Sequence, residues 1–183
     1  IALKALRKLV PEGEWELDVD RTIQRTADSG GEIELDFRRA KSNRVRLVLL
    51  MDSGGSMEPH ARRVEQLFTA ASELKGFKSF EAWHFHNVPY GFLYQNSTGG
   101  ERRTIDDLLR DWTPRHRLVW VGDACMAPYE LMTPTWKDGM TGQDWLKSIR
   151  KHCPCSVWLN PEPPRYWDHP TVRRIGSLFP MHS

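Results

Sequence analysis

The stretch Leu47–Met57, which reads LVLLMDSGGSM, decides the fold of this chain. Its first residues are apolar without a break, as is typical of a parallel strand that is covered on both faces. Asp52 follows this strand directly, and Gly54 and Gly55 then allow a sharp turn that brings Ser56 towards the same point. The stretch therefore predicts a buried strand that delivers a carboxylate and a hydroxyl on one ligand-binding loop.

Strand-like and helix-like segments alternate on both sides of this stretch. The alternation predicts an α/β fold with a doubly wound, Rossmann-like, mostly parallel sheet that is flanked by helices. We expect a helical extension over residues 1–31 and one compact domain over residues 32–183. The expected strands are 33–37, 45–51, 80–86, 92–94, 118–121 and 156–159, with a turn at 41–43. The expected helices are 2–10, 17–27, 64–74, 141–152 and 170–178, with another that begins at Thr104.

Composition excludes several classes of protein. The chain has 183 residues and a formal net charge of +2, so it lacks the strongly basic character of a nucleic-acid binder. No apolar run is long enough to span a bilayer, and no signal-peptide pattern opens the sequence. The three cysteines are too few for a disulfide framework, which favours a cytoplasmic protein. Trp83, Trp120 and Trp158 lie in apolar strand-like runs and are expected in the core.

Polar residues follow the predicted buried strands. Asp52 ends the first of them, His86 and Asn87 end the second, and Asp123 follows the third. Ligands of parallel sheets bind outside the carboxyl ends of the strands, so these residues should lie close together. Two carboxylates with the hydroxyls of Ser56 and Thr104 form an all-oxygen set that suits Mg²⁺, with Mn²⁺ or Ca²⁺ as alternatives.

These features together resemble a von Willebrand factor type A (VWA) domain with a metal-ion-dependent adhesion site. That family has a loop motif Asp-x-Ser-x-Ser, a distant Thr and a distant Asp, which correspond here to Asp52, Ser56, Thr104 and Asp123. Gly54 stands where the motif has its middle Ser. The order of Met-Asp-x-Gly-Gly-Ser-Met, Phe-His-Asn, Gly-Asp-Ala and Val-Trp-Leu-Asn-Pro is similar to the CoxE-like subgroup, in which this Gly is usual.

The resemblance implies a three-layer VWA fold in a bacterial, non-enzymatic adaptor. It implies that Asp52, Ser56, Thr104 and Asp123 hold the cation and that a protein partner supplies an acidic residue as a further ligand. Relatives often act beside a MoxR-type AAA+ ATPase in assembling or remodelling other proteins. The residues expected to line the site and contact the partner are Ser53, Gly54, Gly55, His86, Asn87 and Ala124.

Other interpretations of the same residues stay open at this point. The Asp52–Ser56 segment is also compatible with a strand-to-helix turn, and Thr104 with a simple helix N-cap. His84 and His86 share a strand face, but a zinc site needs further ligands, and a hydrogen-bonded core histidine is the better interpretation of His84. A Mg²⁺-dependent phosphatase with Asp52 as nucleophile is the main enzymatic alternative.

Overall fold

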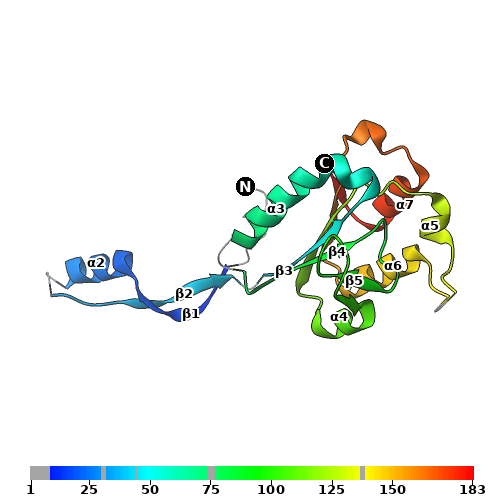
Figure 1. Cartoon of the computed structure of the whole chain (residues 1–183). Coiled ribbons are helices and arrows are strands. Elements are labelled where there is room, and N and C mark those ends of the chain that lie inside the picture. The colour runs from blue at the N-terminus through cyan, green and yellow to red at the C-terminus, as the bar shows by residue number, and fades with distance from the viewer. Residues whose placement is uncertain (1–8, 30–31, 44, 74–76, 137–138) are drawn as a thin grey trace. The chain divides into compact units, whose positions relative to one another are not determined.

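The computed structural model describes residues 9–29, 32–43, 45–73, 77–136 and 139–183 (Figure 1). Backbone contacts divide the chain into two compact units. The smaller comprises Ile1–Val45 with Gly76–Lys78, and the larger comprises Arg46–Lys75 with Ser79–Ser183. The division thus falls after Val45, whereas the sequence suggested a boundary after Gly31.

The smaller unit is an antiparallel pair of strands with a helix between them. β1 (Leu9–Leu17) pairs with β2 (Phe37–Asn43), and α2 (Val19–Asp28) lies between them in the sequence. This helix confirms the one predicted over 17–27. The predicted turn at 41–43 is wrong, because these residues pair with the start of β1. Residues 9–10 of the first predicted helix also lie in β1, and residues 2–8 fall outside the described part of the chain. Cross-strand pairing here overrides local preference.

The larger unit contains a mixed sheet with strand order β6-β5-β4-β3-β7-β8-β9. β3 (Arg46–Asp52) runs parallel to β4 (Ser79–Phe85) on one side and to β7 (His116–Val121) on the other. β8 (Ser156–Leu159) and β9 (Met181–His182) continue the parallel part. β5 (Phe92–Tyr94) and β6 (Arg102–Thr104) extend the other edge with antiparallel pairing. The predicted α/β class with a mostly parallel sheet is confirmed.

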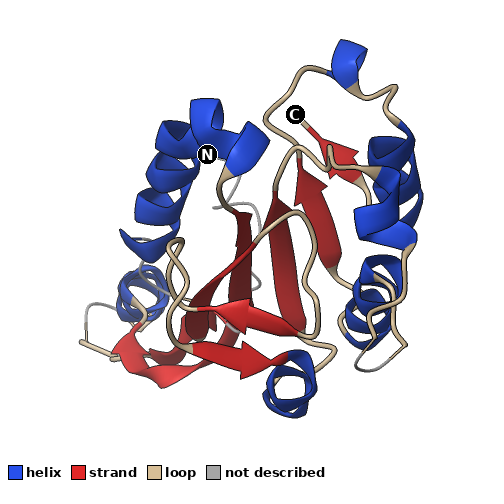
Figure 2. Cartoon of the chain, turned by 45° about the vertical axis from the view of Figure 1, so that its right-hand side comes forward, coloured by secondary structure: helices blue, strands red, loops and turns tan. Residues whose placement is uncertain are grey.

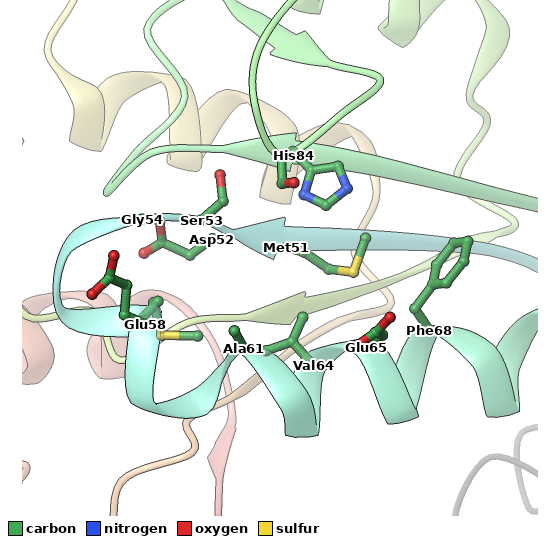
Figure 3. A pocket seen from close by; sticks show the side chains of 12 residues that line it. Met51, Asp52, Ser53, Gly54, Glu58, Ala61, Val64, Glu65, Phe68 and His84 are labelled. Carbon is green, nitrogen blue, oxygen red and sulfur yellow. The ribbon is translucent and has the colours of Figure 1, made fainter.

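Helices lie on both faces of this sheet (Figure 2). α3 (Ala61–Glu73), which follows the short 3-10 helix η1 (Gly55–His60), lies along one face of β3 (Figure 3). α4 (Ile105–Asp111), α6 (Gly142–His152) and α7 (Pro170–Leu178) contribute buried residues to the core on the opposite face. α5 (Pro128–Met132) and η2 (Pro164–Tyr166) are short connecting elements.

Aromatic side chains form the centre of the core. The rings of Trp120 and Trp158 stack with centroids 5.5 Å apart and planes inclined by 3°. Phe85 meets both rings edge-on, and Phe179 packs against both at a tilt. Trp83 is buried in the same cluster, so the three tryptophans that the sequence placed in the core are confirmed there.

The position of β3 determines where a ligand can bind. The chain leaves β3 for β4 on one side of it and later returns to β7 on the other side. Such a reversal leaves a crevice at the carboxyl ends of the two central strands, where α/β proteins bind their ligands. Asp52 is the last residue of β3, and Gly122 alone separates Asp123 from the end of β7.

Candidate functional site

Two buried carboxylates meet at this crevice. Asp52 is 4% exposed and Asp123 is 5% exposed. Burial raises the pKa of Asp52 to about 7, and the negative charge of Asp123 contributes to the rise. The backbone N–H of Asn87 opposes this effect, because it donates to Asp52 Oδ1 at 2.9 Å and stabilises the charged form. The structure therefore brings together the two carboxylates that the sequence selected.

Gly122 allows the close approach of the two strand ends. A Cβ atom at this position would lie 2.9 Å from Cβ of Asp52 and 3.2 Å from its Oδ2. Contacts under 3.0 Å require a backbone or side-chain shift, so any other residue here would displace Asp52. Sequence reasoning did not select Gly122, although a glycine directly before a site carboxylate is a usable signal of close packing.

The glycine turn after Asp52 has a conformation that excludes most other residues. Gly54 has φ 82° and ψ 179°, a region that essentially only glycine populates. Ser53 fixes the turn to the end of β4, because its amide and its hydroxyl both donate to the carbonyl of Phe85. His86 Nδ1 lies 2.7 Å from the carbonyl oxygen of Ser53. The absence of the middle Ser of the adhesion motif thus follows from the backbone at Gly54.

Two predicted lining residues adopt left-handed backbone conformations. Asn87 and Ala124 each have a φ of 58°, which is unusual for residues other than glycine. The side-chain amide of Asn87 donates to Glu130 Oε1 at 2.9 Å, and the carbonyl of Ala124 accepts from the hydroxyl of Thr171 at 2.8 Å. Strained backbone of this kind is concentrated at functional sites, where the surrounding structure holds it in place.

The loop that carries Asp123 is also held from a neighbouring strand end. Asn160 is 2% exposed and follows β8, and its Nδ2 donates to the backbone carbonyl of Asp123 at 2.8 Å. The amide of Cys125 donates to Asp123 Oδ1 at 2.9 Å. Neither Asn160 nor Thr171 was among the predicted site residues. Asn160 could have been found, since it follows a predicted buried strand as Asp52 and Asp123 do.

A crevice of about 440 Å³ extends from Asp52 along the seam between β3 and α3 (Figure 3). The apolar side chains that line it come from β3, η1 and α3: Met51, Met57, Ala61, Val64 and Phe68. Its charged lining residues are Asp52, Glu58 and Glu65, and no Lys or Arg is among the described residues that line it.

A second cavity of about 470 Å³ adjoins Asp123. Ser56 lies on its wall, which places the loop hydroxyl and this carboxylate on one cavity. Glu162 lines it as well and accepts a 2.8 Å hydrogen bond from His60 Nε2. Within the part of the chain that the structure describes, no Lys or Arg lines this cavity either. The carboxylates around the site therefore favour a cation over a phosphate as the bound species.

Thr104 lies apart from this group in the strand order. It ends β6, and β4 and β5 separate β6 from β3. At the usual spacing of strands, β6 lies about 14 Å from β3 across the sheet. Its hydroxyl caps α4, accepting from the amide of Asp107 at 3.2 Å and donating to that residue's Oδ2 at 2.6 Å. This geometry supports the N-cap interpretation of Thr104, and its role as a metal ligand stays a prediction.

His84 differs from the hydrogen-bonded core histidine that we expected. It is half-buried and lines the crevice, and its Nδ1 is buried without a hydrogen-bond partner among the described residues. Burial lowers the pKa of His84 and so favours the neutral ring. Within the described residues, no group of three or more His, Cys, Asp and Glu side chains is arranged to hold a metal ion. Any cation at Asp52 and Asp123 therefore depends on hydroxyl, water or partner ligands as well.

Comparisons with known proteins add no further assignment. No family model, curated protein or solved structure matches the chain. Among the described helices, none has the length and apolar character needed to cross a membrane.

Proposed function

We propose that this protein is a metal-dependent protein-binding module in which Asp52 and Asp123 hold a divalent cation, with Mg²⁺ as the first candidate. The observation that carries the proposal is the pair of buried carboxylates at the central strand ends, beside two cavities that no described Lys or Arg lines. Buried carboxylates without a cationic partner cost free energy. A hard cation with oxygen ligands offsets that cost.

In this proposal, the hydroxyl of Ser56 is a ligand of the cation beside the two carboxylates, and water molecules occupy further positions. The hydroxyl of Ser56 forms no hydrogen bond with another residue in the described part of the protein, so it is available to the cation. Two carboxylates and one hydroxyl leave several positions of an octahedron to water or to an external ligand. The sixth ligand in this proposal is an Asp or Glu of a protein partner, whose charge the cation favours.

The motif resemblance supports a more specific form of the proposal. The sheet reverses its strand order at β3, and helices lie on both of its faces, which agrees with a three-layer VWA domain. In that form the protein belongs to the CoxE-like accessory proteins and works with a MoxR-type AAA+ ATPase. The residues that would surround the partner's carboxylate are Ser53, Gly54, Gly55, His86, Asn87 and Ala124.

Calorimetry with Mg²⁺ and Mn²⁺ tests the cation. The parent protein should bind either ion with measurable heat, and Asp52→Asn and Asp123→Asn should each abolish the signal. Glu65→Gln is the matched control, because it removes another crevice carboxylate and should leave ion binding intact. Thermal unfolding of every variant checks that the fold is kept. Absence of heat in the parent protein would contradict the proposal.

A second measurement separates adhesion from catalysis. Capture of an AAA+ ATPase from the native host should require the divalent cation and should be lost with EDTA and in Asp52→Asn. Release of phosphate from an aryl phosphate ester that depends on Asp52 would instead favour the phosphatase. The carboxylate-rich surroundings of Asp52 argue against that outcome, since a phosphoryl group needs cationic partners.

A further inference from the structure

Several large apolar side chains among the described residues of the smaller unit are exposed. α2 has no buried residue, and its Val19 and Ile23 are 55% and 63% exposed. In the extended segment 32–36, which leads from α2 to β2, Ile33 and Leu35 are 79% and 57% exposed. Exposed apolar side chains that gather on one small unit are typical of a surface that binds another polypeptide.

Polar contacts hold the segment 32–36 beside α2. The hydroxyl of Thr22 accepts from the amide of Asp36 at 3.0 Å, and the hydroxyl of Thr26 accepts from the amide of Glu34 at 3.2 Å. These threonines are four residues apart and so lie on one face of the helix. The contact between helix and segment uses these hydroxyls, and Val19 and Ile23 stay exposed beside it.

The backbone groups on the outer edge of the segment have no hydrogen-bond partner among the described residues. In an extended chain, successive residues direct their N–H and C=O groups to opposite edges. The amides of Glu34 and Asp36 point to α2, so the backbone groups of Ile33 and Leu35 point away from it. No hydrogen bond joins the backbone of Ile33 or Leu35 to any residue in the described ranges. A free edge with alternating side chains can accept an additional strand.

We propose that the segment 32–36 binds an extended stretch of a partner protein in which apolar residues alternate with Lys or Arg. The partner's backbone would pair with the edge at Ile33 and Leu35, and its apolar side chains would pack on these two residues. Its basic side chains would face Glu32 and Glu34, which are exposed and form no ion pair with another described residue. This site is independent of the proposed cation site.

The charge pattern favours such a partner over a second copy of the chain. Side chains that face each other across two strands interact directly, and like charges in these positions are destabilising. Antiparallel pairing of two copies of segment 32–36 would place acidic side chains opposite acidic ones, or opposite Ile33 and Leu35. A basic and apolar strand avoids both conflicts.

Fluorescence anisotropy with the 183-residue chain and a labelled peptide, Val-Lys-Val-Lys-Val-Lys-Val, tests the proposal. The matched control peptides replace Lys by Glu, or keep the composition but place the three lysines in one block. The alternating Lys peptide should bind saturably, and both controls should bind about tenfold more weakly. Glu32→Lys/Glu34→Lys should reverse the preference between the Lys and Glu peptides, which a purely structural role of these residues would not produce.

EDTA should leave the binding of the Lys peptide unchanged, because the peptide site does not need the cation. The peptide-binding proposal and the cation proposal can therefore fail separately. Ile33→Ser/Leu35→Ser should abolish binding without loss of the fold, as judged by circular dichroism. Equal binding of the three peptides, or binding that persists in this variant, would overturn the proposal. Light scattering that detects a dimer dissociated by Leu35→Ser would assign the edge to a second copy. Slow hydrogen exchange at the amides of Ile33 and Leu35 in the free monomer would show that the chain itself covers the edge.

Discussion

The larger and smaller units of this molecule place their charged and apolar side chains in opposite ways. In the larger unit, the carboxylates of Asp52 and Asp123 are buried beside each other at the ends of the central strands. In the smaller unit, Ile33 and Leu35 are exposed, and threonine hydroxyls join their segment to α2. Each arrangement costs free energy in the isolated chain, and in our proposals a different kind of ligand offsets each cost.

The difference separates two kinds of recognition within one chain. A buried pair of carboxylates requires a compact positive charge and gains little from an apolar ligand. An exposed apolar edge requires a polypeptide with matching side chains and gains little from an ion. Changes in pH and in divalent cations should therefore affect the larger unit strongly, whereas truncation of exposed apolar side chains should leave the stability of the protein nearly unchanged.

The largest expected effect is a loss of stability with rising pH in the absence of divalent cations. Because the pKa of Asp52 is about 7 in the folded protein and 3.8 in the unfolded chain, the folded state keeps a proton that the unfolded state releases. The free energy of unfolding should fall by about 3 kcal/mol from pH 5 to pH 8 and change little above that. Urea unfolding in EDTA measures this difference.

Asp52→Asn is the control for this pH dependence. It should remove most of the difference between pH 5 and pH 8, because an amide does not titrate in this range. Saturating Mg²⁺ should restore stability at pH 8 in the parent protein and have no effect in Asp52→Asn. An equal loss of stability in both proteins would show that another group is responsible and would weaken the argument for a costly buried carboxylate.

A smaller effect is expected when the motif's middle serine is introduced. Gly54→Ser should destabilise the protein by about 2 kcal/mol, because φ 82° with ψ 179° is strained for any residue with a Cβ. Space is not the cause, since a Cβ atom here would lie 3.6 Å from its nearest neighbour, His86. Gly176→Ser in α7 is the matched control and should change stability little. Tighter Mg²⁺ binding in Gly54→Ser without loss of stability would contradict this explanation.

The site carboxylates could be predicted from the sequence because their positions follow from a general rule. A continuous apolar run such as Leu47–Met51 indicates a covered strand, and the residues just after it lie at the edge where ligands bind. Asp52 and Asp123 satisfy that rule directly. The helix over 141–152 could also be predicted from the sequence, because it begins at a Thr N-cap and has regular apolar spacing. The structure has this helix at Gly142–His152.

The remaining features depend on contacts that the local sequence does not encode. β1 and β2 contain few apolar residues in a regular pattern. They form because they pair with each other, although α2 separates them in the sequence. Thr171 supports the site through the backbone carbonyl of Ala124, a contact that any residue type can accept. The position of Thr104 depends on the order of strands at the sheet edge, which the spacing of motifs does not reveal.

Replacement of Thr104 tests which of its two interpretations applies. Thr104→Ala should lower the free energy of unfolding by about 1 kcal/mol, because α4 loses its N-cap. Mg²⁺ affinity, measured by calorimetry, should change by less than about twofold, since the hydroxyl is used in the cap and β6 lies away from β3. Thr104→Ser should keep both properties. A complete loss of Mg²⁺ binding in Thr104→Ala would instead bring this residue into the set of metal ligands.

The smallest expected effect concerns the exposed apolar residues of the smaller unit. Leu35→Ala should change the free energy of unfolding by less than about 0.5 kcal/mol, because the side chain has no packed surroundings to lose. The same truncation at Leu49, which is fully buried in β3, should cost about 3 kcal/mol. Urea unfolding of both variants provides the comparison. A large destabilisation by Leu35→Ala would show that this side chain is packed in solution, and an apolar edge that is already covered could not serve as a binding site for a partner strand.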